Sequence, residues 1–434
     1  MKRITAICAL LLIAVASIYA QTDSTEFMKR LCKLDGVNNV SKLASEHYGE
    51  KYVINIQQNV DGNNNAKGTF NQRVIVGFRG YDRPTVIVTE GYSADYSLNP
   101  RYEEELTRLF DANLVFCEYR YFSKSVPEPC NWDYMTVDNS LNDLHNVRQT
   151  LGEVFKGKWI STGISKGGQT TMFYRATYPD DVDVSVSYVA PLNKSVEDGR
   201  HQPFLNDKVG TKEERAAVLN AQRELLKRKP ELIGKFEEYC NSKNYKYNVG
   251  IGEVYDYCVL EYPFALWQWG TPTSSIPATT ADNATWFEHF TKLSSPDYFS
   301  CPNQYLPFFV QAARELGYYG YSIKGLEDLI DTKSTKGYLA KLMLPEELND
   351  IKFDKRLYKR TVKYLKKNDP KHIFIYGEID PWTSSGVAGW LDCSDKLNMR
   401  VYVQPRGSHS ARISTMPENT RHEIIGRITK WLEE

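Results

Sequence analysis

The 434-residue sequence has no surplus of charge of either sign, because 54 basic residues balance 54 acidic ones. Proteins that bind nucleic acids or anionic membranes concentrate positive charge, and the sequence gives no sign of either partner. Cysteine and histidine are too scattered to form a C-x-x-C pair or a cluster with zinc spacing, so we expect no metal and no other cofactor. Outside the N-terminus, no apolar run approaches the roughly 20 residues of a transmembrane helix, so we expect no membrane span in the mature chain.

The N-terminus, in contrast, has the pattern of a secretory signal peptide. Lys2 and Arg3 precede an apolar segment, Ala6–Ala16, of signal-peptide length. Ala20 then supplies the small residue before a cleavage site; the alternative is a membrane anchor, for which the apolar segment is short. We therefore expect residues 1–20 to be removed and the protein to be secreted or periplasmic. An odd number of cysteines would remain, which leaves at least one free thiol and the pairing open: Cys32, Cys117, Cys130, Cys240, Cys258, Cys301 and Cys393.

The rest of the chain alternates between strand-like and helix-like segments. Residues 51–60 and 68–78 predict a strand hairpin, and from there to Val189 short β-branched runs alternate with amphipathic stretches. This alternation predicts a mostly parallel sheet with crossover helices, which is the α/β class. The alternation stops over residues 196–366, which are helical in pattern and dense in aromatic residues, most of which predict a packed core. Strands and helices resume over residues 367–434.

One turn in this alternation has the pattern of a nucleophile elbow. Residues 163–167 fit G-x-S-x-G, a β-prone run precedes them, and a helix-compatible stretch follows. Small residues are needed on both sides of the serine because strand and helix approach closely at such a turn. The pattern predicts the α/β-hydrolase fold with Ser165 as the nucleophile. The α/β-hydrolase domain would consist of residues 21–195 and 367–434, and a mostly helical cap of residues 196–366 would separate these two parts.

The acid and the histidine of such an enzyme follow the last strands, in the order serine, acid, histidine. Asp380 follows a predicted strand at residues 372–376, and His409 follows the next strand in a glycine-bearing loop. Glu378 is an alternative acid at the same strand end, whereas no other histidine combines this order with such a loop. Ser165 would attack a carbonyl carbon, His409 would transfer the proton, and Asp380 would orient the imidazole.

The oxyanion formed by that attack needs two hydrogen-bond donors. The backbone N–H of Lys166, the residue after the nucleophile, is the first, and the loop after the strand at residues 85–89 supplies the second. That loop contains Gly91 and Tyr92, whose N–H groups are both candidates. The Lys166 side chain either adds positive potential to the site or is solvated.

A set of further motifs accompanies the elbow. The stretches are residues 163–168, Asp380-Pro381-Trp382, residues 69–73, residues 118–127, Tyr134-Met135-Thr136 and residues 315–319. Together they resemble a family of secreted bacterial serine peptidases that includes tripeptidyl aminopeptidases and, more widely, the prolylcarboxypeptidase and dipeptidyl peptidase II group. The resemblance spans most of the mature chain and implies an exopeptidase that often acts next to proline. Lys166, where that wider group commonly has tyrosine, and Tyr119, where it often has histidine, favour the aminopeptidase side and leave the cleavage rule open.

The resemblance also implies how a substrate would be held. An aminopeptidase must fix a free α-ammonium at a set distance from the nucleophile, which requires a carboxylate in a partly desolvated pocket. Glu90, beside the oxyanion loop, is the candidate, and the alternative is an ordinary surface glutamate. A proline ring would suit a flat aromatic wall, for which Trp267 and Trp269 of the cap are the candidates.

The sequence therefore predicts a secreted serine exopeptidase that acts on peptide substrates and removes short N-terminal peptides, with tripeptides as candidates. A carboxylic-ester hydrolase is an alternative, because the same triad cleaves esters. A Pro-Xaa carboxypeptidase-like enzyme is a second alternative. A catalytically silent protein that binds peptides or glycans is a third, and the intact triad argues against it. No motif determines the oligomeric state.

Overall fold

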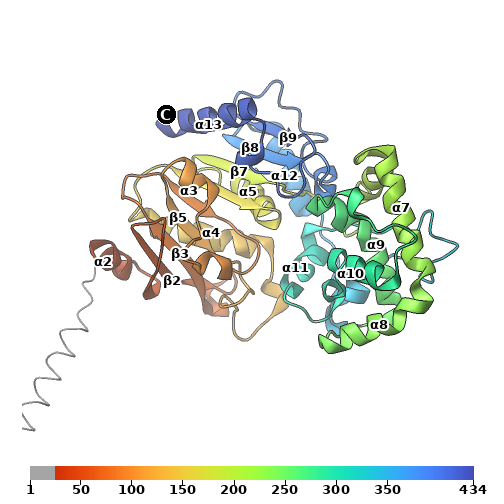
Figure 1. Ribbon diagram of the computed structural model, residues 1–434. Coiled ribbons are helices and arrows are strands. Elements are labelled where there is room, and N and C mark those ends of the chain that lie inside the picture. Colours follow the sequence, from red (N-terminus) through yellow and green to blue (C-terminus); the bar gives the residue numbers. More distant parts are fainter. Residues whose placement is uncertain (1–24) are drawn as a thin grey trace, which may run out of the picture.

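The computed structural model describes residues 25–434, so the expected signal peptide at residues 1–20 lies outside the described part of the chain. Within that part, nine strands form one sheet in the order β1-β2-β3-β5-β4-β6-β7-β8-β9 (Figure 1). The strands are β1 Val37–Leu43, β2 Glu50–Asn59, β3 Thr69–Phe78, β4 Thr85–Val88, β5 Asn113–Cys117, β6 Trp159–Ile164, β7 Val184–Tyr188, β8 His372–Gly377 and β9 Arg400–Gln404. The helices that pack on the sheet are α2 Glu26–Lys33, α3 Glu105–Leu109, α4 Val137–Gly152, α5 Lys166–Thr177, α12 Arg356–Lys367 and α13 Glu418–Glu433.

The sheet changes from antiparallel to parallel across its width. β1, β2 and β3 form an antiparallel meander, and β3 pairs antiparallel with β5. All neighbours from β5 to β9 are parallel. The alternating sequence pattern thus led to the right class, and the chain has the predicted α/β-hydrolase fold. Strand β1 was not predicted, because it lies at the sheet edge, half exposed, and its sequence is largely polar.

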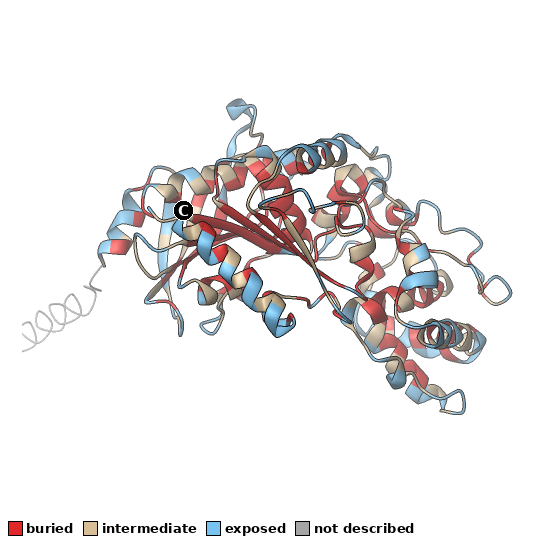
Figure 2. Cartoon of the chain, turned by 90° about the horizontal axis from the view of Figure 1, so that it is seen from above, coloured by how far each residue is buried: buried red, intermediate tan, exposed pale blue. Residues whose placement is uncertain are grey.

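Both faces of the parallel strands are covered by helices. Successive side chains of a strand point to opposite faces. On β8, Phe374 packs with residues of α4, α5 and α12, whereas Ile375 packs with residues of α3 and α13. The central strands are therefore buried along their length, with helices on either side (Figure 2). This packing gives a rigid platform for the loops at the carboxyl ends of the strands.

Between β7 and β8 the chain builds the helical region that the sequence predicts, drawn in green and teal in Figure 1. Its main helices are α7 Lys212–Lys227, α8 Lys229–Ser242, α9 Ile251–Trp269, α10 Asn283–Leu293 and α11 Leu306–Gln311. Their buried aromatic and aliphatic side chains form one core that also includes Trp382 from the loop after β8. The expected cap boundaries at residues 196 and 366 stay a prediction, and the buried side chains of α12 pack with the core of the sheet.

Helix α9 is the central helix of this region, and the sequence did not predict it. It spans 19 residues, is buried on nearly all sides and contains Pro263. A helix without a polar face gives no period of 3.6 residues in hydrophobicity, which is the sequence signal of an amphipathic helix. Among residues 25–434, no helix is both long enough and apolar enough to cross a membrane.

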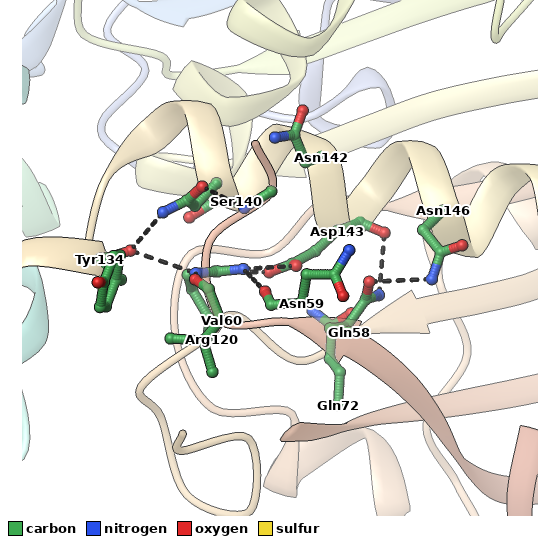
Figure 3. A network of polar contacts seen from close by, with 12 residues as sticks. Gln58, Asn59, Val60, Gln72, Arg120, Tyr134, Ser140, Asn142, Asp143 and Asn146 are labelled. Carbon is green, nitrogen blue, oxygen red and sulfur yellow. Dashed lines mark hydrogen bonds and ion pairs between the residues drawn. The ribbon is translucent and has the colours of Figure 1, made fainter. Parts of the chain in front are cut away.

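A buried guanidinium joins the first strands to α4 (Figure 3). Arg120 is fully buried and forms two hydrogen bonds, each of 2.7 Å, with the two carboxylate oxygens of Asp143 on α4. Its remaining N–H groups donate to the carbonyl oxygens of Asn59, Val60 and Tyr134 at 3.1, 2.9 and 3.2 Å. All five donors of the guanidinium are therefore satisfied, which is what allows the charge to be buried.

We expect replacement of Asp143 by Asn to lower the free energy of unfolding by about 3–5 kcal/mol, because it leaves the Arg120 charge buried without a counter-charge. Denaturant unfolding followed by circular dichroism measures this change. Asp328→Asn is the matched control, because Asp328 pairs with Arg223 at the surface. Equal destabilisation by the two variants would contradict the role given to the Arg120 network.

Candidate active site

Ser165 occupies a strained turn between β6 and α5. Its φ is 57° and its ψ is −118°, a left-handed conformation that serine rarely adopts. The turn is held by the Ser165 N–H, which donates to the carbonyl of Tyr188 at 2.9 Å. A Cβ on Gly163 would lie 2.3 Å from the backbone carbon of Gly167, so strand and helix can approach only because side chains are absent. The backbone at Ser165 has the strand–turn–helix geometry that the motif predicts.

Asp380 and His409 form a buried pair on the loops after β8 and β9. His409 Nδ1 lies 2.7 Å from Asp380 Oδ2, and the side chains are 5% and 0% exposed. The other ring nitrogen, Nε2, has no hydrogen-bond partner among the described residues. Glu378, the alternative acid, is exposed and accepts the N–H of Arg406 at 2.7 Å instead. The structure thus brings Asp380, not Glu378, to the histidine.

The loop after β4 lies directly against the turn of Ser165. A Cβ on Gly91 would lie 2.7 and 2.8 Å from the Cγ and Cβ of Lys166, so only glycine fits there. A Cβ on Gly167 would in turn lie 2.8 Å from the carbonyl oxygen of Glu90. Within the described residues, the backbone N–H groups of Lys166 and Tyr92 donate to no acceptor. Two unused donors therefore stand on the two segments that meet beside Ser165.

The Lys166 side chain is not solvated, which removes one of the two alternatives for it. It is 2% exposed, and its Nζ donates to the carbonyl of Gly91 at 2.7 Å. The ammonium also lies 3.2 Å from the ring centroid of Tyr119, with the rings of Tyr92 and Phe122 farther away. Burial lowers the pKa of Lys166 well below its usual value, while the carboxylates of Glu90 and Glu315 act in the opposite direction. The two departures from the prolylcarboxypeptidase group, Lys166 and Tyr119, are thus in contact with each other.

Ser165 and His409 line a single cavity of about 660 Å³ between the strand ends and the cap. Trp269 is also in its wall, with its ring centroid 6.1 Å from that of His409 and 60% of its side chain exposed. Trp267, the other candidate for an aromatic wall, does not line this cavity and is 2% exposed within the cap core. Of the two tryptophans that the sequence suggests, the structure therefore brings only Trp269 to Ser165.

Glu90 lines the same cavity and is not an ordinary surface glutamate. Its side chain is buried, and Tyr96 donates a hydrogen bond to Oε2 at 2.7 Å. Burial raises the pKa of Glu90 to about 7, against the hydrogen bond from Tyr96 and the charge of Lys166, which both lower it. Glu90 is therefore a desolvated carboxyl group next to the loop after β4.

Sequence reasoning missed a second carboxyl group in this cavity, Glu261 on α9. Glu261 is one of three acidic residues in the aromatic stretch of α9, which the sequence identified only as core. It also missed Glu118, which is fully buried, forms an ion pair with Arg73 and accepts the N–H of Ala94 at 3.0 Å. The signal for Glu118 and Arg73 was present, because both lie in stretches that carry the family resemblance.

Residues 25–434 contain no group of three or more His, Cys, Asp or Glu side chains that could hold a metal ion. The seven cysteines of this part of the chain are all free thiols. The candidate site consists of a serine, a histidine, carboxyl groups, a lysine and aromatic rings. Such a set can carry out acyl transfer by a nucleophilic serine.

Comparison with known proteins gives matches over nearly the whole chain. The family described as PS-10 peptidase S37 matches residues 20–433. The chain is 29% identical to the prolyl tri/tetrapeptidyl aminopeptidase of Streptomyces mobaraensis over 413 residues, which cover 93% of this chain and 84% of that protein. It is 26% identical to the human lysosomal Pro-X carboxypeptidase over 158 residues, 32% of each chain. Among solved structures, it is similar to a proline iminopeptidase of Mycobacterium smegmatis, with a TM-score of 0.40 and 12% identity over 91% of this chain and 99% of that one.

The resemblance inferred from the motifs is thereby confirmed, including the weaker similarity to Pro-X carboxypeptidases. The family match begins before β1 and ends within α13, so it includes the sheet, the cap and every residue of the candidate site. The protein is a serine-type peptidase and belongs to the PS-10 peptidase S37 family.

Proposed function

We propose that the protein is an exopeptidase that releases short peptides from free N-termini through Ser165, His409 and Asp380. The observation that carries the proposal is that Ser165 and His409 line one cavity under the cap, while His409 Nε2 has no partner among the described residues and Asp380 holds the other ring nitrogen. Asp380 fixes the tautomer that leaves Nε2 free to accept the serine proton. Ser165 Oγ then attacks the carbonyl carbon, the amine leaves with the proton from His409, and water hydrolyses the acyl-enzyme.

The oxyanion of each tetrahedral intermediate would be bound by the N–H groups of Lys166 and Tyr92. Both N–H groups lack an acceptor within the described chain. The Lys166 ammonium donates a hydrogen bond of 2.7 Å to the Gly91 carbonyl oxygen. This carbonyl belongs to the same peptide group as the Tyr92 N–H, so the hydrogen bond orients that N–H. Donors fixed before the reaction stabilise developing charge without reorganisation. The Gly91 N–H, the other sequence-based candidate, lies beside the Glu90 carboxylate and lowers its pKa.

Removal of peptides from the amino end is favoured over the carboxyl end by the extent of the similarity. The Streptomyces mobaraensis relative, which is named a prolyl tri/tetrapeptidyl aminopeptidase, matches 93% of this chain, whereas the human Pro-X carboxypeptidase matches 32%. A carboxyl group in a desolvated cavity suits an α-ammonium. The exposed ring of Trp269 beside His409 is a flat surface against which a proline ring near the scissile bond could pack. Ester hydrolysis and peptide binding without catalysis are the alternatives.

Activity against a substrate panel tests the reaction class. We expect the mature protein to cleave free-amine tripeptide p-nitroanilides at least about tenfold faster than their acetylated forms, because only the free amine can pair with a buried carboxylate. We expect Ser165→Ala to reduce kcat by more than about 10⁴-fold and to abolish labelling by a fluorophosphonate. Short acyl esters turned over without any amide cleavage would favour the ester hydrolase. A wild-type protein that a fluorophosphonate does not label would indicate a silent binder.

The contact between the two loops beside Ser165 gives a second test. We expect Gly91→Ala to lower kcat of the folded enzyme by about 100-fold, because the new Cβ overlaps the Lys166 side chain and displaces an oxyanion donor. Steady-state kinetics with the same p-nitroanilide measures the loss. Gly199→Ala is the control, since Gly199 is exposed and a Cβ there meets no atom within 4 Å. Equal kinetics of the two variants would argue against an oxyanion hole at this loop.

We also propose that the protein is exported, as the pattern of residues 1–20 indicates. When the full chain is expressed in a bacterial host, we expect mass spectrometry of the purified protein to find Gln21 as its first residue. A protein recovered from the cytoplasm with Lys2 or Met1 still attached would show that the segment is not a cleaved signal.

A further inference from the structure

Helix α9 presents one face to the active-site cavity. Glu261, Ala265, Gln268 and Trp269 of this helix all line the cavity, with the spacing expected for one helical face. The C-terminal end of the face lies next to the candidate triad, because the Gln268 carbonyl accepts the N–H of His409 at 2.9 Å. Glu261 lies about two turns earlier, toward the far end of the cavity.

The Glu261 carboxyl group is positioned for a hydrogen-bond donor that the described part of the chain does not supply. Tyr319 and Tyr321 donate to its Oε2 at 2.8 and 2.6 Å. Its Oε1 has no hydrogen-bond donor within residues 25–434 and is not sealed from the cavity. The side chain as a whole is only 8% exposed. One oxygen is thus fixed by tyrosines, and the other is left for a ligand.

No cation within residues 25–434 balances this carboxyl group. The two other acidic side chains inside α9 each pair with a lysine, Glu253 with Lys341 and Asp256 with Lys229. Burial raises the pKa of Glu261 to about 7, and only the two tyrosine hydroxyls lower it. A buried carboxylate without a counter-charge is costly, so a bound cation would be strongly favoured there.

Glu90, which the sequence suggests as the residue that binds the substrate α-ammonium, lies in a different environment. The Lys166 ammonium already lowers the pKa of Glu90, and Glu90 directly precedes the loop that would bind the oxyanion. An ammonium at Glu90 would therefore lie close to the scissile carbonyl and to a like charge. That position leaves little room for the residues of a released peptide.

The helix sets a distance between the two ends of the cavity. Glu261 and Trp269 are about 12 Å apart along the helix axis, at a rise of 1.5 Å per residue. An extended peptide spans about 3.3–3.6 Å per residue, so this distance corresponds to three or four residues between a free amine and a scissile bond. A single residue or a dipeptide would be too short to reach from one end to the other.

From these contacts we infer that Glu261 Oε1 binds the α-ammonium of the substrate, and that the separation of Glu261 from the His409 end of α9 selects the release of three or four residues. The inference rests on the proposed exopeptidase function and assigns the residue that recognises the free N-terminus. Tyr319 and Tyr321 act as positioning residues that fix the carboxylate, and they do not touch the scissile bond.

Glu261→Gln in the mature chain tests the assignment, with Glu90→Gln as the competing variant and Glu253→Gln as a charge-matched control on the same helix. Each is assayed with Ala-Ala-Pro-p-nitroanilide carrying a free or an acetylated amine. For Glu261→Gln we expect KM for the free-amine substrate to rise at least about tenfold with little change in kcat, and the preference for the free over the acetylated amine to disappear. Glu253→Gln should behave as the wild type does, and Glu90→Gln should retain the preference.

Loss of the preference in Glu90→Gln and not in Glu261→Gln would overturn the assignment and place the anchor at Glu90. Retention of the preference in both variants would overturn it as well. If Glu261→Gln does not fold, the wild type still decides, through kcat/KM for free-amine substrates that release one to five residues. A maximum at three or four supports the inference, and a maximum at one or two contradicts it. A wild-type protein that cleaves no amide would instead refute the proposed function itself.

Discussion

The contact between Gly91 and Lys166 is the constraint on which the active site depends. Strands β4 and β6 are parallel neighbours, so the loop after β4 and the turn of Ser165 meet at the same edge of the sheet. They fit together only because Gly91 has no side chain, and the Lys166 ammonium then binds the Gly91 carbonyl. A lysine buried next to a nucleophile is costly, and the ring of Tyr119 and the charge of Glu90 offset part of that cost. One side chain thereby fixes both segments that carry the proposed oxyanion donors.

The sheet and the cap contribute different parts of the site. The strand ends supply Ser165, Asp380, His409 and the oxyanion loop, whose geometry is set by backbone pairing and by glycines at close contacts. The cap supplies α9, which lines the cavity and bonds to the His409 backbone through the Gln268 carbonyl. A buried helix in contact with the triad loop holds its side chains at fixed distances from the chemistry. The proposed length selection would therefore depend on α9, and the reaction on the strand ends.

The sequence predicted those parts whose local pattern is distinctive. The glycine spacing around Ser165 and the order of Asp380 and His409 follow from strand and helix geometry. These three residues could therefore be predicted from the sequence alone. Glu261 could not, because α9 lacks a polar face and nothing in its sequence separates Glu261 from the other two acidic residues of that helix. Trp267 and Trp269 are close in sequence but differ in exposure, which depends on how α9 packs in the cap. The contact of Lys166 with Tyr119 joins residues 47 positions apart and required the fold.

The most direct test of this account is a crystal structure of the Ser165→Ala variant with the free tripeptide Ala-Ala-Pro bound as product. The account predicts that the tripeptide ammonium lies within about 3 Å of Glu261 Oε1, and that its carboxylate accepts the N–H groups of Lys166 and Tyr92. A tripeptide bound in the opposite direction, or with its ammonium on Glu90, would contradict the assignment of the two ends of the cavity.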